Sequence, residues 1–407
     1  MSTIVSDVVV IGAGAMGSAA AYALARRGAR VTAIDRFAPP HARGSSHGRT
    51  RIIREAYFEH PAYVPLVRRA YQLWAELERE TGRALFRRTG GLTLGAEDGV
   101  LVSGALRSAR EHAVDHEVLD AGALRRRVPA LAPPPNTVAV LEHRAGILFP
   151  ERCVEALRAA ARARGAQLLT EERVVRWDAS SGFVSVTTDR AVHRARRVIL
   201  AAGAWLAQLA PDLGVPLKVE RQVVHWITPR KHPERVSARN LPVAIWEYAP
   251  GCMFYLIPDV GDGLKAALHH QGATVDPDAP IAPATAAEQA GVLALVDRYL
   301  NDAAGIVSES ATCLYTNTPD GHFVIDAHPG LPEVIVASAC SGHGFKFAPA
   351  IGDALADLAL GNEPAVDLAP FRLARFKGGQ DRTLPDGVGT GQAGWVKPGG
   401  TGRSRIG

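Results

Sequence analysis

Three glycines near the start of the chain have the spacing of a turn that binds a dinucleotide. Gly12, Gly14 and Gly17 form a GxGxxG pattern between an apolar stretch and a predicted helix, and Asp35 ends the next predicted strand. In such a turn the first glycine permits a sharp bend, the second admits a pyrophosphate and the third lets the helix pack closely on the strand, while the acidic residue binds ribose hydroxyls. The pattern therefore predicts a bound dinucleotide, without separating FAD from NAD.

Two later segments have a composition that suits the same ligand. Residues 198–205, VILAAGAW, read as an apolar strand that ends in small residues and can pack close to a dinucleotide. Residues 340–352, CSGHGFKFAPAIG, open a helix with Pro349 in its first turn. The N-terminus of that helix could stabilise the negative charge of a reduced flavin. An ordinary turn between a strand and a helix explains the pattern equally well.

Cysteine and lysine are the rarer residue types that could carry chemistry. The four cysteines, Cys153, Cys252, Cys313 and Cys340, show no CxxC spacing and no close pair, which predicts a reducing compartment and neither a disulfide framework nor a metal site. Taken alone, a strand cysteine such as Cys313 is most often a small buried apolar residue. Only six of the 46 basic residues are lysines, so a lysine inside a motif is informative, although a solvated surface lysine is the usual alternative.

The composition describes a large globular protein. A chain of 407 residues that is 47% apolar and 21% charged can bury a sizeable core and is long enough for two domains. The formal charge of +5 comes from scattered basic residues, which favours anionic small molecules as ligands over nucleic acid. The apolar run over residues 8–25 contains interior glycines and reads as strand, turn and helix, so we expect a cytoplasmic protein without a membrane span.

Periodicity and turn signals outline an alternation of strands and helices. Residues 6–35 read as a βαβ unit, followed by a polar and basic loop over residues 39–54. Helices are predicted at 62–80, from Pro150, at 285–300 and at 345–360. Strands are predicted at 173–177 and 183–188, throughout 217–270, on both sides of the acidic turn after Cys313, and at 333–339.

The order of these elements predicts an α/β protein with two discontinuous domains. Segments of a Rossmann-like, dinucleotide-binding fold are interleaved with β-rich insertions. We expect the dinucleotide-binding domain to comprise residues 1–85, 146–214 and 320–375, and the β-rich substrate domain to comprise residues 86–145 and 215–319. Residues 376–407 are rich in glycine and lack apolar periodicity, which predicts a disordered tail.

Several long motifs together resemble one family of flavoproteins. GSSHGRTRIIREAY, CLYTNTPDGHFVID and SGHGFKF follow the GxGxxG turn in this order, and the sequence is similar to the monomeric sarcosine oxidase and N-methyltryptophan oxidase family from about residue 5 to FRLARF at 371–376. The resemblance implies a monomer with FAD that oxidises a secondary amino acid or related amine with O2. The products would be H2O2 and an imine, which water hydrolyses to an aldehyde and a primary amine.

The resemblance also implies roles for individual residues. Cys313 matches the cysteine that forms a thioether with the flavin 8α-methyl group, so FAD should be covalently bound. Arg54 and Lys346 match the pair that binds the substrate carboxylate, for which a guanidinium suits two parallel hydrogen bonds. Arg51 is expected near the flavin, and Lys265 near flavin N5, where an ammonium promotes the reaction with O2.

The remaining expected site residues complete the pocket. His269 matches an active-site histidine, and Tyr255 matches a tyrosine that lines the substrate pocket. Further cofactor contacts are expected in the turn that precedes the last helix and at four scattered positions. These residues are Gly342, His343, Gly344, Ser45, Thr50, Val174 and Gly203.

Three departures from the family pattern leave the substrate open. Arg49 stands where the family carries Asp, Ala339 and Cys340 replace a glycine and a bulky apolar residue, and residues 269–278, HHQGATVDPD, differ after the first histidine. Two alternatives therefore remain: an oxidase or dehydrogenase of a cyclic imino acid such as pipecolate or proline, or a flavin-holding subunit without turnover. An NAD-dependent reductase would leave the motifs around Cys313 and Lys346 unexplained.

Overall fold

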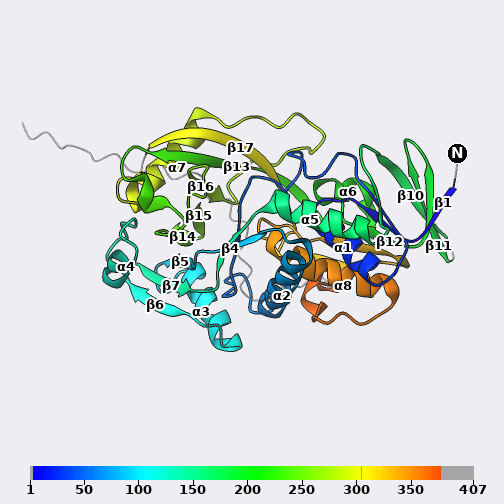
Figure 1. Ribbon diagram of the computed structural model, residues 1–407, viewed down its shortest axis with the longest axis horizontal. Helices are drawn as coiled ribbons and strands as arrows, with labels where there is room; N and C mark the ends of the chain where they lie inside the picture. Colours follow the sequence, from blue (N-terminus) through cyan, green and yellow to red (C-terminus); the bar gives the residue numbers. More distant parts are fainter. Residues whose placement is uncertain (1–2, 181, 304, 377–407) are drawn as a thin grey trace, which may run out of the picture.

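The computed structural model describes residues 3–180, 182–303 and 305–376. Figure 1 shows two lobes along the long axis of the molecule, each built on one large sheet. None of the helices in the described ranges has the length and apolar character that crossing a membrane requires. The predicted disordered tail lies, apart from Phe376, outside the described residues.

The first lobe contains a mixed sheet of eight strands covered by helices. The strand order is β10 (Val174–Ser180), β11 (Phe183–Thr188), β12 (Val192–Leu200), β1 (Thr3–Ile11), β2 (Val31–Ile34) and β9 (Gln167–Leu169), and β19 (Leu331–Ser338) pairs with both β12 and β18 (Val324–His328). Strand β1 runs parallel to β2 and β12. The helices are α1 (Ala15–Arg26), α2 (Tyr63–Thr81), α5 (Pro150–Ala163) and α8 (Ala348–Leu360).

Strand β1 is buried on both faces, which explains its continuous apolar run. Val8 and Val10 pack in the core cluster that contains the helices, whereas Val9 and Ile11 pack in a second cluster on the opposite face. Side chains alternate between the faces of a strand, so a strand covered on both sides needs apolar residues at every position. The glycine turn thus follows directly from a rigid central strand.

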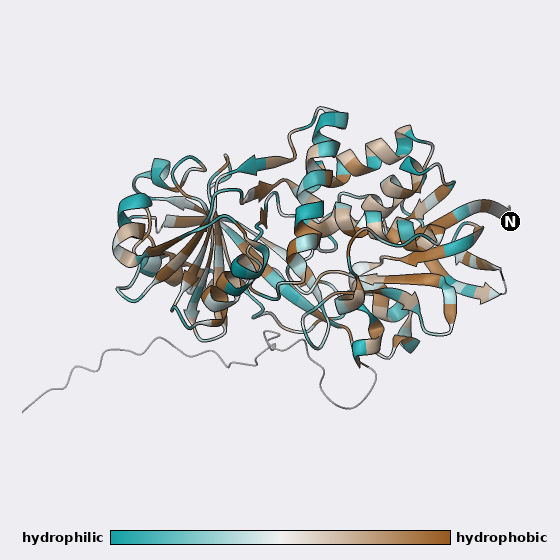
Figure 2. Cartoon of the chain, turned by 90° about the horizontal axis from the view of Figure 1, so that it is seen from below, coloured by the Kyte–Doolittle hydropathy of each residue, from teal (hydrophilic) through white to brown (hydrophobic). Residues whose placement is uncertain are grey.

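The second lobe contains a sheet of eight strands with one face covered by a helix. The order is β17 (Gly305–Asn317), β13 (Lys218–Pro229), β16 (Leu264–His269), β15 (Cys252–Ile257), β14 (Val243–Ala249), β5 (Gly91–Gly95), β7 (Val138–Glu142) and β6 (Glu117–Asp120). Helix α7 (Ala286–Tyr299) begins with a capping box between Thr285 and Glu288. Its Val292 and Val296 pack in one cluster with side chains of β14, β15 and β16. Figure 2 shows the apolar residues concentrated within the sheets of both lobes.

Smaller elements connect the two lobes. A sheet of three short strands has the order β3 (Arg51–Ile53), β8 (Gly146–Leu148) and β4 (Phe86–Arg88). Helices α3 (Val100–His112), α4 (Ala121–Arg127) and α6 (Leu206–Leu209) complete the α-helices of the described residues. The 3-10 helices are η1 (Gly203–Trp205), η2 (Pro211–Leu213), η3 (Pro233–Val236), η4 (Phe345–Phe347), η5 (Ala369–Phe371) and η6 (Leu373–Phe376).

The predicted α/β class is confirmed. The predicted loop over residues 39–54 ends in strand β3, and the segment between residues 86 and 145 also differs from the prediction. For residues 86–145 the sequence predicted part of a β-rich domain, and the structure adds helices α3 and α4. Helix α4 has only seven residues, so its periodic signal is short. Helix α3 has 13 residues, and its buried residues follow helical spacing, so its signal was present in the sequence and was overlooked. The domain boundaries stay a prediction.

Helices α1 and α8 pack in direct backbone contact. A Cβ atom placed on Gly352 of α8 would lie 2.4 Å from the carbonyl carbon of Ala19 in α1. Beside this contact, Asp353 is ion-paired with Arg26, Arg27 and Arg69 at 3.1, 2.9 and 2.8 Å. Since each of these two helices follows a turn of the candidate site, the contact fixes the distance between those turns.

We expect Gly352→Ala to destabilise the protein, because the added methyl group must displace the backbone of α1. The cost should be about 1–3 kcal/mol, as for other overpacked cores. Gly291 of α7 is the matched control, because no atom lies within 4 Å of a Cβ placed there. Gly291→Ala should raise stability by up to about 1 kcal/mol through helix propensity. Urea unfolding curves measure both, and equal midpoints for the two variants would contradict this packing.

Candidate functional site

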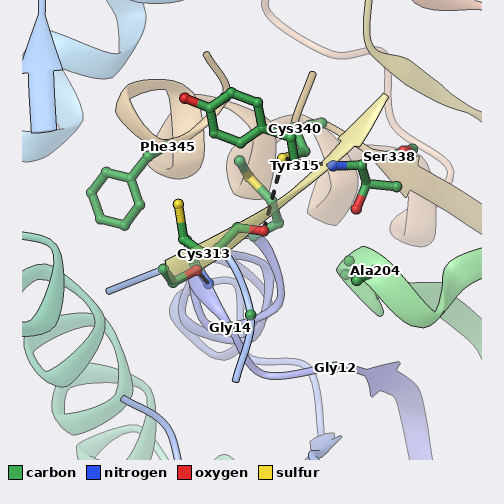
Figure 3. Close-up of a pocket in the computed structure, with 18 of the residues that line it drawn as sticks. Gly12, Gly14, Ala204, Cys313, Tyr315, Ser338, Cys340 and Phe345 are labelled. Carbon is green, nitrogen blue, oxygen red and sulfur yellow. Dashed lines mark hydrogen bonds between the residues drawn. The ribbon is translucent and has the colours of Figure 1, made fainter. Parts of the chain in front are cut away.

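A large cavity lies between the two lobes and receives residues from both sheets. Its volume is about 370 Å³, and its wall includes the glycine turn after β1, the segment 44–54, the ends of β12 and β19, and strands β14 to β17. Figure 3 shows Gly12 and Gly14 on one side of Cys313, with Phe345 and Tyr315 on the other side. The cavity therefore connects the predicted dinucleotide turn with the predicted substrate residues.

The glycine turn has the backbone shape that the motif predicts. Gly12 has a φ of +92°, and a Cβ atom there would lie 2.5 Å from the carbonyl oxygen of Ala201 at the end of β12. A Cβ atom on Gly17 would lie 1.7 Å from the Gly12 oxygen, whereas Gly14 would meet only the hydroxyl of Ser46, at 3.5 Å. Gly12 and Gly17 thus permit close packing, and Gly14 leaves room for a ligand.

Asp35 lies next to this glycine turn. Its carboxylate accepts hydrogen bonds from the backbone N–H groups of Ala13 at 2.7 Å and Phe37 at 2.8 Å. Asp35 also lines the cavity, where its oxygens can accept further hydrogen bonds from hydroxyl groups. This arrangement suits the ribose of a dinucleotide.

Three strands of the second lobe's sheet direct one set of side chains into the site. Tyr255 of β15, His269 of β16 and Cys313 and Tyr315 of β17 all line the cavity. Their sequence neighbours Phe254, Leu256 and Leu268 pack with α7 on the opposite face. Because strand residues point alternately to the two faces, the core under α7 fixes which residues reach the site.

Cys313 is a buried thiol near two cations. Its residue is 5% exposed. Burial raises the pKa of the Cys313 thiol, and the charges of Arg51 and Lys265 oppose this increase. The positive charges of Arg51 and Lys265 can therefore stabilise the thiolate form of Cys313, which is the reactive form of a cysteine.

Arg51 and Lys265 are held by carbonyl oxygens of the segment 45–50. Arg51 donates to the carbonyl oxygens of Thr50 at 2.9 Å, Ser45 at 3.0 Å and His47. Lys265, which is 1% exposed, donates from Nζ to the carbonyl oxygens of Gly48 at 2.7 Å and Thr50 at 3.0 Å. Burial, followed by the charge of Arg51, holds the pKa of Lys265 well below its usual value.

Arg54 is buried and already paired with a carboxylate. It is 4% exposed and donates from Nη2 to Glu59 Oε2 at 2.6 Å and from Nη1 to the Ala56 oxygen at 2.9 Å. Its Nε atom is buried without a hydrogen-bond partner. Because Glu59 balances the charge of Arg54, the net positive charge of this end of the cavity depends on Lys346.

Lys346 is the second buried cation at this end. Its Nζ donates to the carbonyl oxygen of His343 at 2.7 Å and to the hydroxyl of Tyr57 at 3.1 Å. Burial and then the charge of Arg54 lower the pKa of Lys346 to about 7. This lysine therefore changes its charge near neutral pH.

Three rings converge over Gly342 in the turn before α8. A Cβ atom on Gly342 would lie 2.7 Å from Tyr315, 2.8 Å from His270 and 2.9 Å from His269, and the residue has a φ of +78°. The Tyr315 hydroxyl is 3.4 Å from His269 Nδ1. Removal from bulk water, and then His270, keep the pKa of His269 well below its usual value, so the ring is neutral at neutral pH.

Comparisons with known sequences place the chain in a family. Residues 7–358 match the family described as FAD dependent oxidoreductase. The monomeric sarcosine oxidase of Streptomyces avermitilis is 43% identical over 369 residues, which is 90% of this chain and 96% of the relative. The chain belongs to the monomeric sarcosine oxidase and N-methyltryptophan oxidase family. It is therefore an FAD-dependent oxidoreductase, as the sequence motifs predicted.

Other relatives and solved structures agree with this family. The N-methyl-L-tryptophan oxidase of Salmonella newport is 36% identical over 373 residues, covering 91% of this chain and 99% of the relative. NikD, an amino acid oxidase essential for nikkomycin biosynthesis, matches with a TM-score of 0.77 at 25% identity over 90% of this chain and 96% of that chain. L-proline dehydrogenase from P. horikoshii has the same TM-score of 0.77 at 23% identity over 92% and 98%, which shows the shared fold.

The cavity fits the FAD that this family binds. Gly14 leaves space at the start of α1, and Asp35 faces the cavity beside it. The hydroxyl of Thr50 is buried without a hydrogen-bond partner and its residue lines the cavity. An unsatisfied buried hydroxyl is costly unless a ligand bonds to it.

Sixteen of the residues expected from the sequence line this cavity together. They are Gly12, Gly14, Asp35, Ser45, Thr50, Arg51, Arg54, Val174, Gly203, Tyr255, His269, Cys313, Gly342, His343, Gly344 and Lys346. Two expected residues lie outside the lining: Gly17 packs under the turn, and Lys265 lies behind Gly48 and Thr50. Their contact with a ligand stays a prediction.

The sequence analysis missed three groups that complete the site. Glu59 follows Arg54 by five residues and neutralises it, and Tyr57 bonds Lys346. Asp278, in the segment between β16 and α7, lies outside the cavity lining and accepts hydrogen bonds from the lining residues Trp205 and Gln208 at 3.0 Å each. Only Glu59 had a usable signal, since a buried arginine requires a nearby carboxylate.

Proposed function

We propose that this protein oxidises N-methyl amino acids and passes the electrons to O2. The observation that carries this proposal is the buried pair of Arg54 and Lys346 at one end of a cavity whose other end is the dinucleotide turn. Buried cations without enough carboxylates to balance them suit an anionic ligand. The relatives named as oxidases of sarcosine and N-methyl-L-tryptophan support a substrate with a secondary amine and a carboxylate.

The chain's own groups would bind and orient such a substrate. Lys346 and the free Nε of Arg54 bind the carboxylate, which places the amine toward the β-sheet side of the cavity. Tyr255, Tyr315 and the neutral ring of His269 form that side and exclude water. Because the surrounding charge is positive, the neutral form of the substrate amine is favoured over its ammonium form.

FAD, once bound, supplies the two-electron chemistry that converts the amine to an imine. The residues proposed to hold it are the glycine turn, Asp35, Thr50 and the cation Arg51. Lys265 adds a buried amino group whose two N–H bonds to carbonyl oxygens keep its position fixed and favour its ammonium form against the effect of burial. Such a group stabilises negative charge that develops when O2 is reduced.

Cys313 is proposed as the covalent attachment point of FAD. Its buried thiol lines the cavity, and Arg51 and Lys265 lie close enough to affect its pKa. We expect acid-precipitated wild-type protein to remain yellow, whereas Cys313→Ser should release its flavin into the supernatant. Cys340→Ser is the matched control, because this second thiol lines the same cavity. If the control releases the flavin and Cys313→Ser retains it, the attachment point is wrong.

Lys346 should make the binding of carboxylates depend on pH. Its pKa of about 7 means that it is an ammonium below that pH and an amine above it. The affinity for propanoate should therefore fall only about twofold between pH 6 and 7 and by up to about tenfold per pH unit above pH 7. Titration of the flavin absorbance with propanoate measures this.

The Lys346→Met variant provides the control for this dependence. It should bind propanoate about 10- to 100-fold more weakly at pH 6, from the loss of a charge-assisted hydrogen bond, and should show no loss of affinity above pH 7. Arg54→Met is a poorer test, because it leaves Glu59 buried without its partner. Equal affinities of wild type and Lys346→Met would contradict the assignment.

Replacing Lys265 should slow the reoxidation of the flavin by O2 much more than the reduction of the flavin by substrate. Purified wild type with sarcosine or a larger N-methyl amino acid in air should release H2O2. In stopped-flow measurements, Lys265→Met should slow the reoxidation of the bound flavin by O2 about 10²- to 10³-fold, the usual effect of removing one well-placed charge. Anaerobic reduction by the same substrate should change much less. Reoxidation at the wild-type rate would mean that O2 reacts elsewhere.

A further inference from the structure

A chain of hydrogen bonds joins Lys346 to a backbone carbonyl through two buried side chains. The Nζ of Lys346 is 3.1 Å from the hydroxyl of Tyr57, and this hydroxyl is 2.7 Å from Nδ1 of His343. The Nε2 of His343 is 3.1 Å from the carbonyl oxygen of Gly321. Lys346 and His343 line the cavity, whereas Tyr57 lies behind them and is 0% exposed.

The direction of these hydrogen bonds follows from the last partner. A carbonyl oxygen only accepts, so His343 carries its proton on Nε2 and has a lone pair on Nδ1. Tyr57 therefore donates its single proton to His343. The Tyr57 oxygen is also 3.3 Å from the His343 carbonyl oxygen, which is another acceptor, so the proton points to His343 with either partner.

This direction constrains Lys346. Because its proton is used, the Tyr57 oxygen offers only lone pairs to Nζ, and the carbonyl oxygen of His343 at 2.7 Å does the same. Two of the three substituent positions of Nζ must therefore be N–H groups in both charge states. The third position carries a proton in the ammonium and a lone pair in the amine.

We propose that Tyr57 is a positioning residue that, through His343, orients Lys346 and favours the ammonium form that binds the substrate carboxylate. The inference rests on the carboxylate site proposed above and goes beyond it. It assigns the charge state of that site to a tyrosine that touches neither substrate nor cofactor. A hydrogen bond from an ammonium is stronger than one from an amine, so an obligatory acceptor stabilises the charged form.

The ionisation of the surrounding groups supports this assignment. Burial holds the pKa of Tyr57 well above its usual value and the pKa of His343 well below its usual value. Both side chains are therefore neutral from about pH 6 to 9. The other charged or titratable groups that act on Lys346 come from β3, the segment after it and β16, and are Arg51, Arg54, Glu59 and His269.

The decisive variant is Tyr57→Phe, which removes the acceptor and keeps the ring. We expect the pH at which propanoate affinity begins to fall to move about one unit or more below the wild-type value, because the ammonium loses a charge-assisted hydrogen bond. Affinity at low pH should approach that of wild type. A role confined to packing would weaken binding equally at every pH.

Tyr63 provides a matched control. Its ring centroid is 4.8 Å from that of Tyr57, it is also 0% exposed, and its hydroxyl bonds a histidine, His322, at 3.0 Å. Tyr63→Phe thus removes the same buried group from the same aromatic cluster without touching Lys346. We expect its pH profile to match that of wild type.

Two variants of His343 test the direction of the chain and remain informative if Tyr57→Phe folds poorly. In His343→Asn a carbonyl oxygen can replace Nδ1 as the acceptor for Tyr57, so the pH at which affinity falls should stay near the wild-type value. In His343→Leu only the main-chain carbonyl oxygen of residue 343, 3.3 Å from the Tyr57 oxygen, remains as an acceptor, so that pH should be lowered less than in Tyr57→Phe.

The outcomes separate this inference from the carboxylate site itself. If wild type loses affinity above pH 7 and Tyr57→Phe shifts as Tyr63→Phe does, the role of Tyr57 is overturned while the carboxylate site stands. If wild type and Lys346→Met both show no dependence on pH, the carboxylate site is wrong and the inference fails with it.

Discussion

The structure of the site depends on one requirement: each buried cation needs hydrogen-bond acceptors from the protein in place of its hydration. Arg51, Arg54, Lys265 and Lys346 all lie in or behind the cavity wall, and all four donate to backbone carbonyl oxygens. Burying a charge is costly unless hydrogen bonds replace its hydration. Carbonyl oxygens in helices and sheets are already bonded, so the acceptors must come from irregular segments. The loop over residues 44–50 supplies them for Arg51 and Lys265, the segment after β3 supplies Ala56 for Arg54, and the turn over 339–344 supplies His343 for Lys346.

Regular structure contributes the other half of the site. Strands β15, β16 and β17 lie in one sheet. The core beneath α7 fixes which face of β15 and β16 reaches the cavity, and Leu314 of β17 packs instead with Ala204 and Val219. A shift of one residue in any of them would exchange site residues for core residues. The sheet thus positions the aromatic and thiol side chains of the cavity, and the irregular loops position the cations.

The sequence predicted the parts of this arrangement that have a local signature. The glycine turn, Asp35 and the helix after Gly344 depend on short-range patterns, and each lies where it was expected. Contacts between distant segments were harder to predict, because no pattern in the sequence announces them. In the sequence Tyr57 has no feature that separates it from other aromatic residues. Its role depends on a contact with His343, which is far away along the chain. Helix α3 differs from Tyr57, because its buried residues Leu101, Val102, Ala105, Ser108 and Ala109 have helical spacing that could have predicted it.

The contact between Gly352 and the backbone of Ala19 has a consequence for how this scaffold can change. Helices α1 and α8 each follow one turn of the site, and at Gly352 the backbone of α8 lies directly against Ala19 of α1. Neither turn can shift to suit a bulkier substrate without disturbing the other. We therefore expect substitutions that change the substrate to occur on the sheet side of the cavity. There Ile245 and Tyr255 line the cavity, and their strands are not connected to either of these two turns. Laboratory libraries confined to β14 and β15 can explore new amines while the electron-transfer machinery stays intact.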